Sequence, residues 1–204
     1  MKNILVNIVY RQEDYKDNIL DIISKCRSEN YDVYINICDY TLKKDANSLD
    51  LSAIESDSNN VNVLELDYED LSDHDRKIFQ LVDSKEFLAV IDLDASVQSE
   101  DNFIDDLEVN VLEDNNYGCV YSDFYSKTKS GKKIYIYQKS FPFVSNAVPL
   151  VAFSVENYVK NINEENIKGM ILSNLISRHI PKALCCISNC LLYTSPSPRD
   201  RTRS

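Results

Sequence analysis

In Phe87-Leu-Ala-Val-Ile-Asp-Leu-Asp94 an apolar run leads directly into two aspartates. A short continuous apolar run of this kind is typical of a strand that is buried on both faces of a sheet. Alternate residues of a strand point to the same face, so Asp92 and Asp94 are expected to present two carboxylates together. Mg²⁺ commonly binds one or two protein carboxylates together with the oxygens of a phosphate-bearing substrate. The pattern therefore indicates a cation site, and the alternative is a strand end that acids merely make soluble.

Residues 190–204 differ in character from the rest of the chain. Cys190-Leu-Leu-Tyr-Thr-Ser-Pro-Ser-Pro-Arg-Asp200 resembles, residue for residue, one reading frame of the transposon adapter used in short-read sequencing libraries. The alternative is a natural disordered tail rich in Ser, Pro and Arg. On the first interpretation the chain is a metagenomic fragment whose authentic sequence ends near Asn189, and 190–204 is left out of fold prediction as an expression tag would be.

The length and charge of the remaining chain limit its class. Residues 1–189 are long enough to bury one sizeable core, so we expect a single domain. The formal net charge is −11, and residues 190–204 contribute +2 of it, so residues 1–189 carry −13. Such an acidic surface argues against binding nucleic acid through charge. A nucleotide remains a possible ligand, because it requires only a local site and a cation.

The cysteines and the N-terminus predict a cytoplasmic location. Five of the six cysteines precede residue 190, and they show no Cys-x-x-Cys spacing, so we expect reduced thiols in the core. The N-terminus leads directly into a strand pattern rather than a signal peptide. No apolar run approaches the ~20 residues of a spanning helix, so no membrane segment is expected in the visible chain.

The first half of the chain alternates predicted strands and helices. Strands are expected at 3–10, 32–38, 61–66 and 87–92, helices at 14–29 and from Ser72 or Asp73 to Val82, and mainly loop at 40–60. This order predicts an α/β fold with a mostly parallel sheet and helices on both faces. Ligands of such sheets bind beyond the carboxyl ends of the strands. Asp39, Asp67 and the Asp92/Asp94 pair all lie at such ends, so we expect them to converge on one site.

The second half favours antiparallel strands. Strands are expected at 117–125, 133–138 and 148–153, and an amphipathic helix at 164–179 with Pro181 as its stop signal. Gly131 lies between the first two of these strands and can adopt the positive φ that a hairpin turn often needs. The lysines around it either contact a diphosphate or belong to a solvated turn that discourages edge pairing.

Taken in order, these segments resemble the family 2 glycosyltransferases, which have the GT-A fold. The resemblance covers almost all of 1–189 and implies one GT-A domain with an antiparallel hairpin in its second half. It rests on the two opening strands, on the Asp-x-Asp strand, and on later segments: Gly118-Cys-Val-Tyr-Ser-Asp-Phe-Tyr125, 136–143, 146–149, 163–175 and Ile180-Pro-Lys-Ala-Leu184. The ordered set carries the resemblance, since no single motif is specific.

For the donor side, the resemblance implies a nucleotide-sugar donor and a divalent cation. Asp39 would accept a hydrogen bond from the nucleotide base. Asp94 would bind Mn²⁺ or Mg²⁺ bridging the diphosphate, and Asp92 would hold the ribose or a metal-bound water. The cation would neutralise the leaving nucleoside diphosphate.

For the acceptor side, the resemblance implies an inverting transfer to a hydroxyl of a glycan or another acceptor. Glu165, or alternatively Glu164, would deprotonate that hydroxyl as the general base. Asp123 would hold the donor sugar or the acceptor.

Departures from the family pattern keep other functions open. Cys38-Asp-Tyr-Thr41 lacks the family's usual glycine, Ala95 follows the Asp-x-Asp motif where the family often has Asp, and the base motif is Glu164-Glu-Asn166. One alternative is therefore a catalytically inactive GT-A-like domain that serves as a binding or scaffold module. A sugar nucleotidyltransferase is a third possibility, weakened because Arg11-Gln-Glu-Asp14 offers no Gly-rich basic loop after the first strand.

Other motifs give little support to a different chemistry. His74 and His179 lack partners at ligand spacing and are expected to be surface or helix-end histidines. Ser122-Asp123 lacks a glycine-flanked elbow and a plausible His, which argues against a hydrolase triad. The chain has no Gly-x-x-x-x-Gly-Lys-Ser/Thr motif. The tyrosines of 117–137 either stack on a base or sugar or are simply strand residues.

Overall fold

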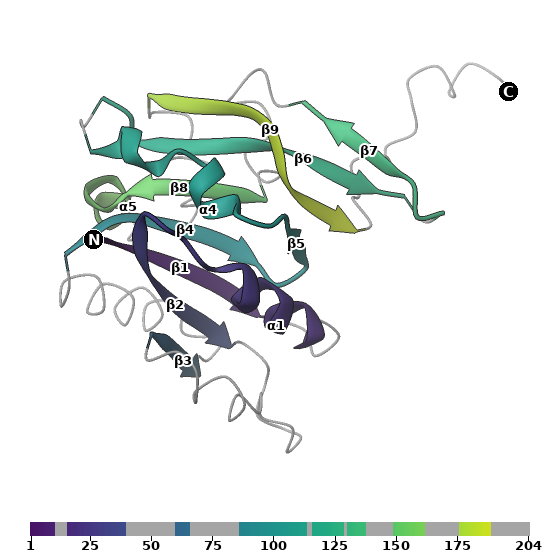
Figure 1. Cartoon of the computed structure of the whole chain (residues 1–204), viewed down its shortest axis with the longest axis horizontal. Helices are drawn as coiled ribbons and strands as arrows, with labels where there is room; N and C mark the ends of the chain where they lie inside the picture. The colour runs from purple at the N-terminus through teal and green to yellow at the C-terminus, as the bar shows by residue number, and fades with distance from the viewer. Residues whose placement is uncertain are drawn as a thin grey trace, which may run out of the picture.

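The computed structural model describes residues 1–10, 16–39, 60–65, 86–113, 116–128, 130–137, 149–161 and 176–188. Within these ranges the chain forms one mixed nine-stranded sheet in the order β3-β2-β1-β4-β8-β6-β9-β5, with β7 paired to β6 (Figure 1). The α/β class expected from the sequence is confirmed.

Four parallel strands form the first half of the sheet: β1 (Lys2–Tyr10), β2 (Tyr31–Asp39), β3 (Val61–Glu65) and β4 (Phe87–Asp94). The helix α1 (Lys16–Lys25) connects β1 to β2. Apolar residues on both sides of β1 and β4 are fully buried, which explains why these strands are continuous apolar runs rather than alternating ones. The strand β4 begins at Phe87 as predicted and extends two residues beyond the predicted end, to Asp94.

The second half of the sheet is largely antiparallel. The strand β8 (Leu150–Ser154) lies between β4 and β6 (Cys119–Lys127) and is antiparallel to both. The strand β7 (Lys133–Ile136) pairs with β6 as the predicted hairpin. Gly131 adopts φ = 83° in its turn, as expected. Figure 1 shows this hairpin extending beyond the neighbouring strands.

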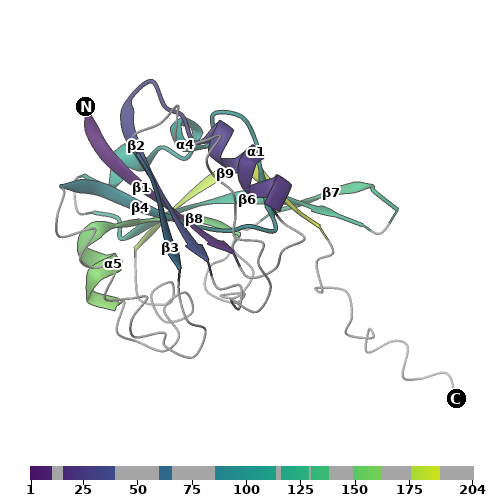
Figure 2. The same cartoon turned by 90° about the horizontal axis from the view of Figure 1, so that it is seen from below.

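Helices cover both faces of the sheet, as predicted (Figure 2). On one face, Ile19 and Ile22 of α1 pack in a core cluster with β1 and β4, and the short helices α4 (Phe103–Asp106) and η2 (Val109–Leu112) join it. On the other face, Tyr158 of α5 (Val155–Asn161) packs against Phe153 at a ring-centroid distance of 6.0 Å. Of the predicted site residues, Asp92, Asp94 and Asp123 lie on the second face.

The prediction of a helix over 164–179 is wrong in its C-terminal part. Residues 177–179 lie in β9 (Ser177–Ser188) rather than in a helix over 164–179, because Ser177–Ile180 pairs in parallel with Cys119–Ser122. Pairing with a central strand here outweighs the helical spacing of the apolar residues. Pro181 does not stop a helix but lies at a break in the strand register, where a missing N–H is tolerated.

Several predicted features fall outside the described residues. They are the loop at 40–59, the helix starting at Ser72 or Asp73, the residues 164–175 of the predicted helix, and the tail 190–204. The cysteines expected in the core are buried and free: Cys26, Cys38, Cys119, Cys185 and Cys186. Among the helices that the structure describes, none is long and apolar enough to cross a membrane. The strand β5 (Val97–Ser99) completes the sheet at its edge beside β9.

Candidate functional site

Asp92 is a nearly buried carboxylate at the carboxyl end of β4, with 8% of its surface exposed. Asn7 Nδ2 donates to Asp92 Oδ1 at 3.2 Å, and the Tyr158 hydroxyl donates to the same oxygen at 3.5 Å. No described residue hydrogen-bonds Asp92 Oδ2. This oxygen is not sealed in the core either, because Ser99 Oγ is the only fully buried, unpartnered side-chain N or O atom in the described chain. One oxygen of Asp92 is thus fixed, and the other is open to a ligand.

Three asparagines extend this contact across the parallel half of the sheet. Asn62 of β3, Asn36 of β2 and Asn7 of β1 lie in register with Asp92 of β4. Asn62 Nδ2 donates to Asn36 Oδ1 at 3.2 Å, and Asn36 Nδ2 donates to Asn7 Oδ1 at 3.2 Å. We call these three asparagines the amide ladder. Asn7 and Asn36 are buried, whereas Asn62 at the outer end of the ladder is exposed. Buried amides that are hydrogen-bonded to one another are rigid, so Asn7 and Asn36 fix the position of the Asp92 carboxylate.

The ladder crosses an otherwise apolar face. Leu5, Val90 and Phe87 surround it, and Cys38 accepts a hydrogen bond from Asn36 Nδ2 at 3.4 Å. Burial, and secondarily the nearby Asp92 charge, raises the pKa of the Cys38 thiol. Cys38 therefore stays neutral and contributes no charge to the site.

Asp94 is held by the turn that follows β4. Its Oδ1 accepts hydrogen bonds from Ser96 N at 3.0 Å and from Ser96 Oγ at 2.6 Å. A short acid that binds the backbone two residues ahead is a common way to start a turn. Ala95 is 1% exposed and packs in the core of the opposite face. Ala95, which replaces the aspartate that the family often has here, therefore packs in the core.

The two carboxylates fit a cation that arrives with its own oxygen ligands. No group of three or more His, Cys, Asp or Glu side chains converges within the described ranges, so the chain supplies no complete protein cage there. Asp92 and Asp94 supply hard oxygen atoms on one face of one strand end. Mg²⁺ is usually held in this way, with one or two carboxylates and the phosphates of the substrate. The residues thus suit Mg²⁺ or Mn²⁺ bound together with a diphosphate.

The other predicted donor and base residues are only partly described. Asp39 is the last residue of β2, and its backbone lies at the same sheet edge as Asp94, since Val9 pairs with both Cys38 and Asp94. Nothing is described of the Asp39 side chain. Glu164, Glu165 and Asp67 lie outside the described residues. Their roles remain predictions.

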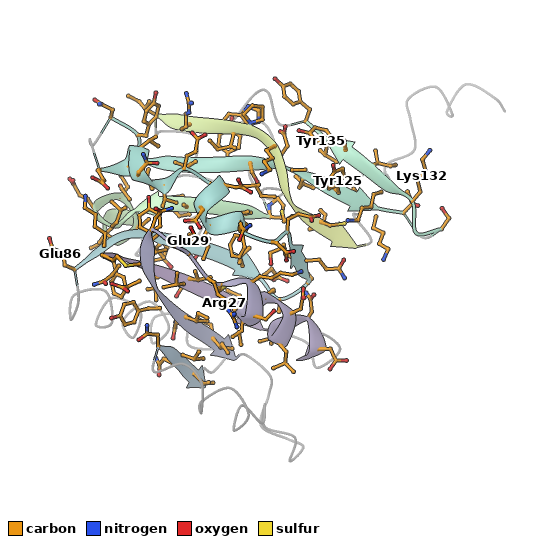
Figure 3. The ribbon with its side chains drawn as sticks, viewed as in Figure 1. Arg27, Glu29, Glu86, Tyr125, Lys132 and Tyr135 are labelled. Atoms are coloured by element: carbon orange, nitrogen blue, oxygen red, sulfur yellow. The ribbon has the colours of Figure 1, made fainter. Side chains whose placement is uncertain are left out.

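Asp123 lies on the same face of the sheet, on β6, and is fully buried. Its Oδ2 accepts a hydrogen bond from the Tyr135 hydroxyl at 2.6 Å, and its Oδ1 lies 2.8 Å from His179 Nε2. Figure 3 shows Tyr135 and Tyr125 on the β6–β7 hairpin. The expectation that His179 is a surface or helix-end histidine is therefore wrong. The strand pairing that joins these residues has no signature in local sequence spacing.

Ser122 does not complete a hydrolase triad with this pair. Adjacent side chains of a strand point to opposite faces, so Ser122 points away from the face of Asp123. Its hydroxyl donates instead to the Asp123 backbone carbonyl at 3.0 Å. The argument against a Ser hydrolase stands, although a histidine does lie beside Asp123.

Solved structures share this fold. S. aureus TarS 1–349 in complex with UDP-GlcNAc aligns with a TM-score of 0.59 at 12% identity, over 100% of this chain and 62% of that chain. GalNAc-T7 with UDP, GalNAc and Mn²⁺ aligns with a TM-score of 0.61 at 13% identity, over 99% of this chain and 46% of that chain. No protein-family model and no curated protein sequence matches. The comparisons show a GT-A fold, in a chain that spans less than two thirds of either neighbour.

Proposed function

We propose that this chain is a glycosyltransferase domain that moves a sugar from a nucleotide-diphosphate donor to an acceptor hydroxyl, with a divalent cation and with inversion. The structural neighbours that contain UDP, UDP-GlcNAc or Mn²⁺ support a nucleotide-sugar ligand for this fold. The low sequence identity leaves the sugar and the nucleotide open.

The arrangement of Asp92 carries the proposal. A carboxylate that is 8% exposed, with one oxygen held by Asn7 and Tyr158, is costly to bury unless it has a use or full compensation. It lies where ligands of parallel sheets bind, and Asp94 follows it on the same face. A purely solubilising acid would not require the two buried amides of Asn7 and Asn36 behind it.

The proposed roles follow from position. Asp92 and Asp94 would hold Mn²⁺ or Mg²⁺, and the bound cation would neutralise charge on the leaving nucleoside diphosphate. Asp39, at the end of β2, would hydrogen-bond the nucleotide base. Glu165, or alternatively Glu164, would take the proton of the acceptor hydroxyl.

The test is calorimetric titration of the chain with UDP, GDP and CMP, each with and without Mn²⁺. We expect one nucleotide to bind only with Mn²⁺, and Asp94→Asn to abolish that binding. Asp101→Asn is the matched control, because it removes the same charge from an exposed turn beside α4 on the opposite face. The control should bind like the unmodified chain.

The alternative functions predict different results. A catalytically inactive binding or scaffold domain predicts a folded chain that binds none of the three nucleotides. A sugar nucleotidyltransferase predicts release of pyrophosphate from a nucleoside triphosphate and a sugar 1-phosphate. Mn²⁺-dependent binding that persists in Asp94→Asn would show that Asp94 is not needed to hold the cation.

A further inference from the structure

A second cluster on the same face of the sheet lies apart from the Asp92/Asp94 pair. It comprises Asp123, Tyr121, Tyr135, Tyr137 and His179, and we call it the Asp123 cluster. Side chains alternate along the hairpin, so Ile136 turns toward the core while Tyr135 and Tyr137 are 44% and 55% exposed. The hairpin therefore offers aromatic rings to solvent beside a fully buried carboxylate.

His179 connects the buried carboxylate to the surface. Its ring stacks on Tyr121 with centroids 5.1 Å apart and lies in a T-shaped arrangement with Tyr137, with centroids 5.5 Å apart. The side chain is 20% exposed, whereas Asp123 is 0% exposed. Tyr135 and His179 each form a hydrogen bond with one oxygen of the Asp123 carboxylate. A ligand at the surface would therefore interact with this carboxylate indirectly, through the His179 imidazole.

The contact with Asp123 determines which ring nitrogen faces the ligand. A carboxylate only accepts hydrogen bonds, so Nε2 of His179 carries the proton. In the neutral ring Nδ1 then presents a lone pair as a hydrogen-bond acceptor. The stacked Tyr121 fixes the ring plane. The result is a fixed acceptor atom beside the exposed ring of Tyr137.

We propose that His179 and Tyr137 form a carbohydrate-binding subsite, in which Nδ1 accepts a hydrogen bond from a sugar hydroxyl and the Tyr137 ring packs against the C–H face of the sugar. Exposed aromatic rings suit the weakly polar C–H faces of a pyranose because their own faces are electron-rich. Directional polar groups beside an apolar surface are typical of small-molecule sites. That this sugar belongs to the acceptor rests on the function proposed above.

The place of the cluster in the sheet favours binding over catalysis. Asp92 is in register with Val151, and Val151 is in register with Tyr121, which pairs with His179. Three strand spacings put the His179 backbone about 14 Å from that of Asp92. This distance separates the cluster from the two carboxylates that would hold the cation. The cluster also lacks a third metal-ligating side chain among the described residues.

The test is NMR of the full chain with ¹⁵N-labelled histidine, in EDTA and without nucleotide. The chain has two histidines, so His179→Gln assigns the signals and His74 serves as an internal reference. The probes are methyl glycosides of glucose, galactose, mannose, N-acetylglucosamine and N-acetylgalactosamine. We expect the Nε2–H tautomer at His179, and a saturable shift of its Nδ1 resonance with at least one glycoside.

A matched pair of variants tests the stacking. Tyr137→Ala should weaken glycoside binding about fivefold to tenfold, whereas Tyr137→Phe keeps the ring and should stay within about twofold. The subsite is refuted if no glycoside moves the His179 signals of the folded chain, or if Tyr137→Ala binds as the unmodified chain does. Nucleotide titration is a separate measurement on other residues. Glycoside binding without nucleotide binding would refute the proposed function alone, and the reverse would refute the subsite alone.

Discussion

Asn7→Asp tests whether the amide ladder holds the Asp92 carboxylate. The substitution is nearly isosteric, and it replaces the Nδ2 donor that lies 3.2 Å from Asp92 Oδ1 with a second carboxylate oxygen. At an effective dielectric constant of about 20, two charges at this separation repel by about 5 kcal/mol. Protonating one carboxyl instead, from a pKa near 4, costs about 5 kcal/mol at pH 7.5 and about 1.4 kcal/mol at pH 5.

The cheaper of the two responses determines the loss of stability. We therefore expect Asn7→Asp to lower the free energy of unfolding by about 4–5 kcal/mol at pH 7.5, and by about 1–2 kcal/mol at pH 5. The sign follows from linkage. The paired carboxyls have a raised pKa in the folded state, so the folded variant binds more protons than the unfolded one and gains stability as the pH falls.

Urea unfolding in EDTA at the two pH values measures this difference. Asn3→Asp is the matched control, since Asn3 lies on the same strand but donates to the Glu86 carbonyl at an exposed position. The control should lose less than about 1 kcal/mol at either pH. An equal loss at pH 5 and pH 7.5 in Asn7→Asp, or a loss as small as in the control, would refute the reasoning.

Three further changes test other parts of the structure. The hydrogen bond to Asp123 raises the pKa of Tyr135 to about 12, so its stabilising effect should be full below pH 10 and be lost as the pH rises through 12. Tyr135→Phe should therefore cost about 1 kcal/mol at pH 8, and its difference from the unmodified chain in urea unfolding should shrink above pH 11. Gly131→Ala should lower the free energy of unfolding by about 1 kcal/mol, through backbone strain alone, because φ is +83° and an added Cβ meets nothing within 4 Å. In Cys190→Ser, the remaining thiols should react with a disulfide reagent at pH 8 only after unfolding, because each is buried and burial raises the pKa of Cys26 and Cys119 to about 12. A thiol that reacts rapidly in the native chain would contradict the described core.

The sequence predicted the parallel strands well because a strand that is buried on both faces is a continuous apolar run, which can be recognised in the sequence. The apolar run from Phe87 predicted a strand over 87–92, and β4 begins there and extends to Asp94. The hairpin turn was predicted from an equally local feature, because a glycine such as Gly131 readily adopts the positive φ found in that turn. Residues 177–179 were mispredicted because their strand partner, β6, lies more than fifty residues earlier in the chain. The contact between His179 and Asp123 spans 56 residues and was missed for the same reason.

The amide ladder was missed although a faint signal was present. Each of three predicted strands carries an asparagine inside an apolar run, at Asn7, Asn36 and Asn62. An isolated asparagine in such a run has no assigned partner until the strand register is known. Asparagine is also depleted in strands. Three in consecutive parallel strands therefore indicate a shared polar layer, which is visible only when the strands are aligned.

The ladder also links the register of the sheet to the candidate site. A shift of one residue in a strand moves its side chains to the opposite face. A shift in β1 or β2 would therefore bury Asn7 or Asn36 among apolar residues without hydrogen bonds, at about 1–3 kcal/mol for each unpaired group. The arrangement with all amides paired is the one that places Asn7 beside Asp92. The same hydrogen bonds thus select the strand register and orient the carboxylate, so a substitution that weakens one should weaken the other.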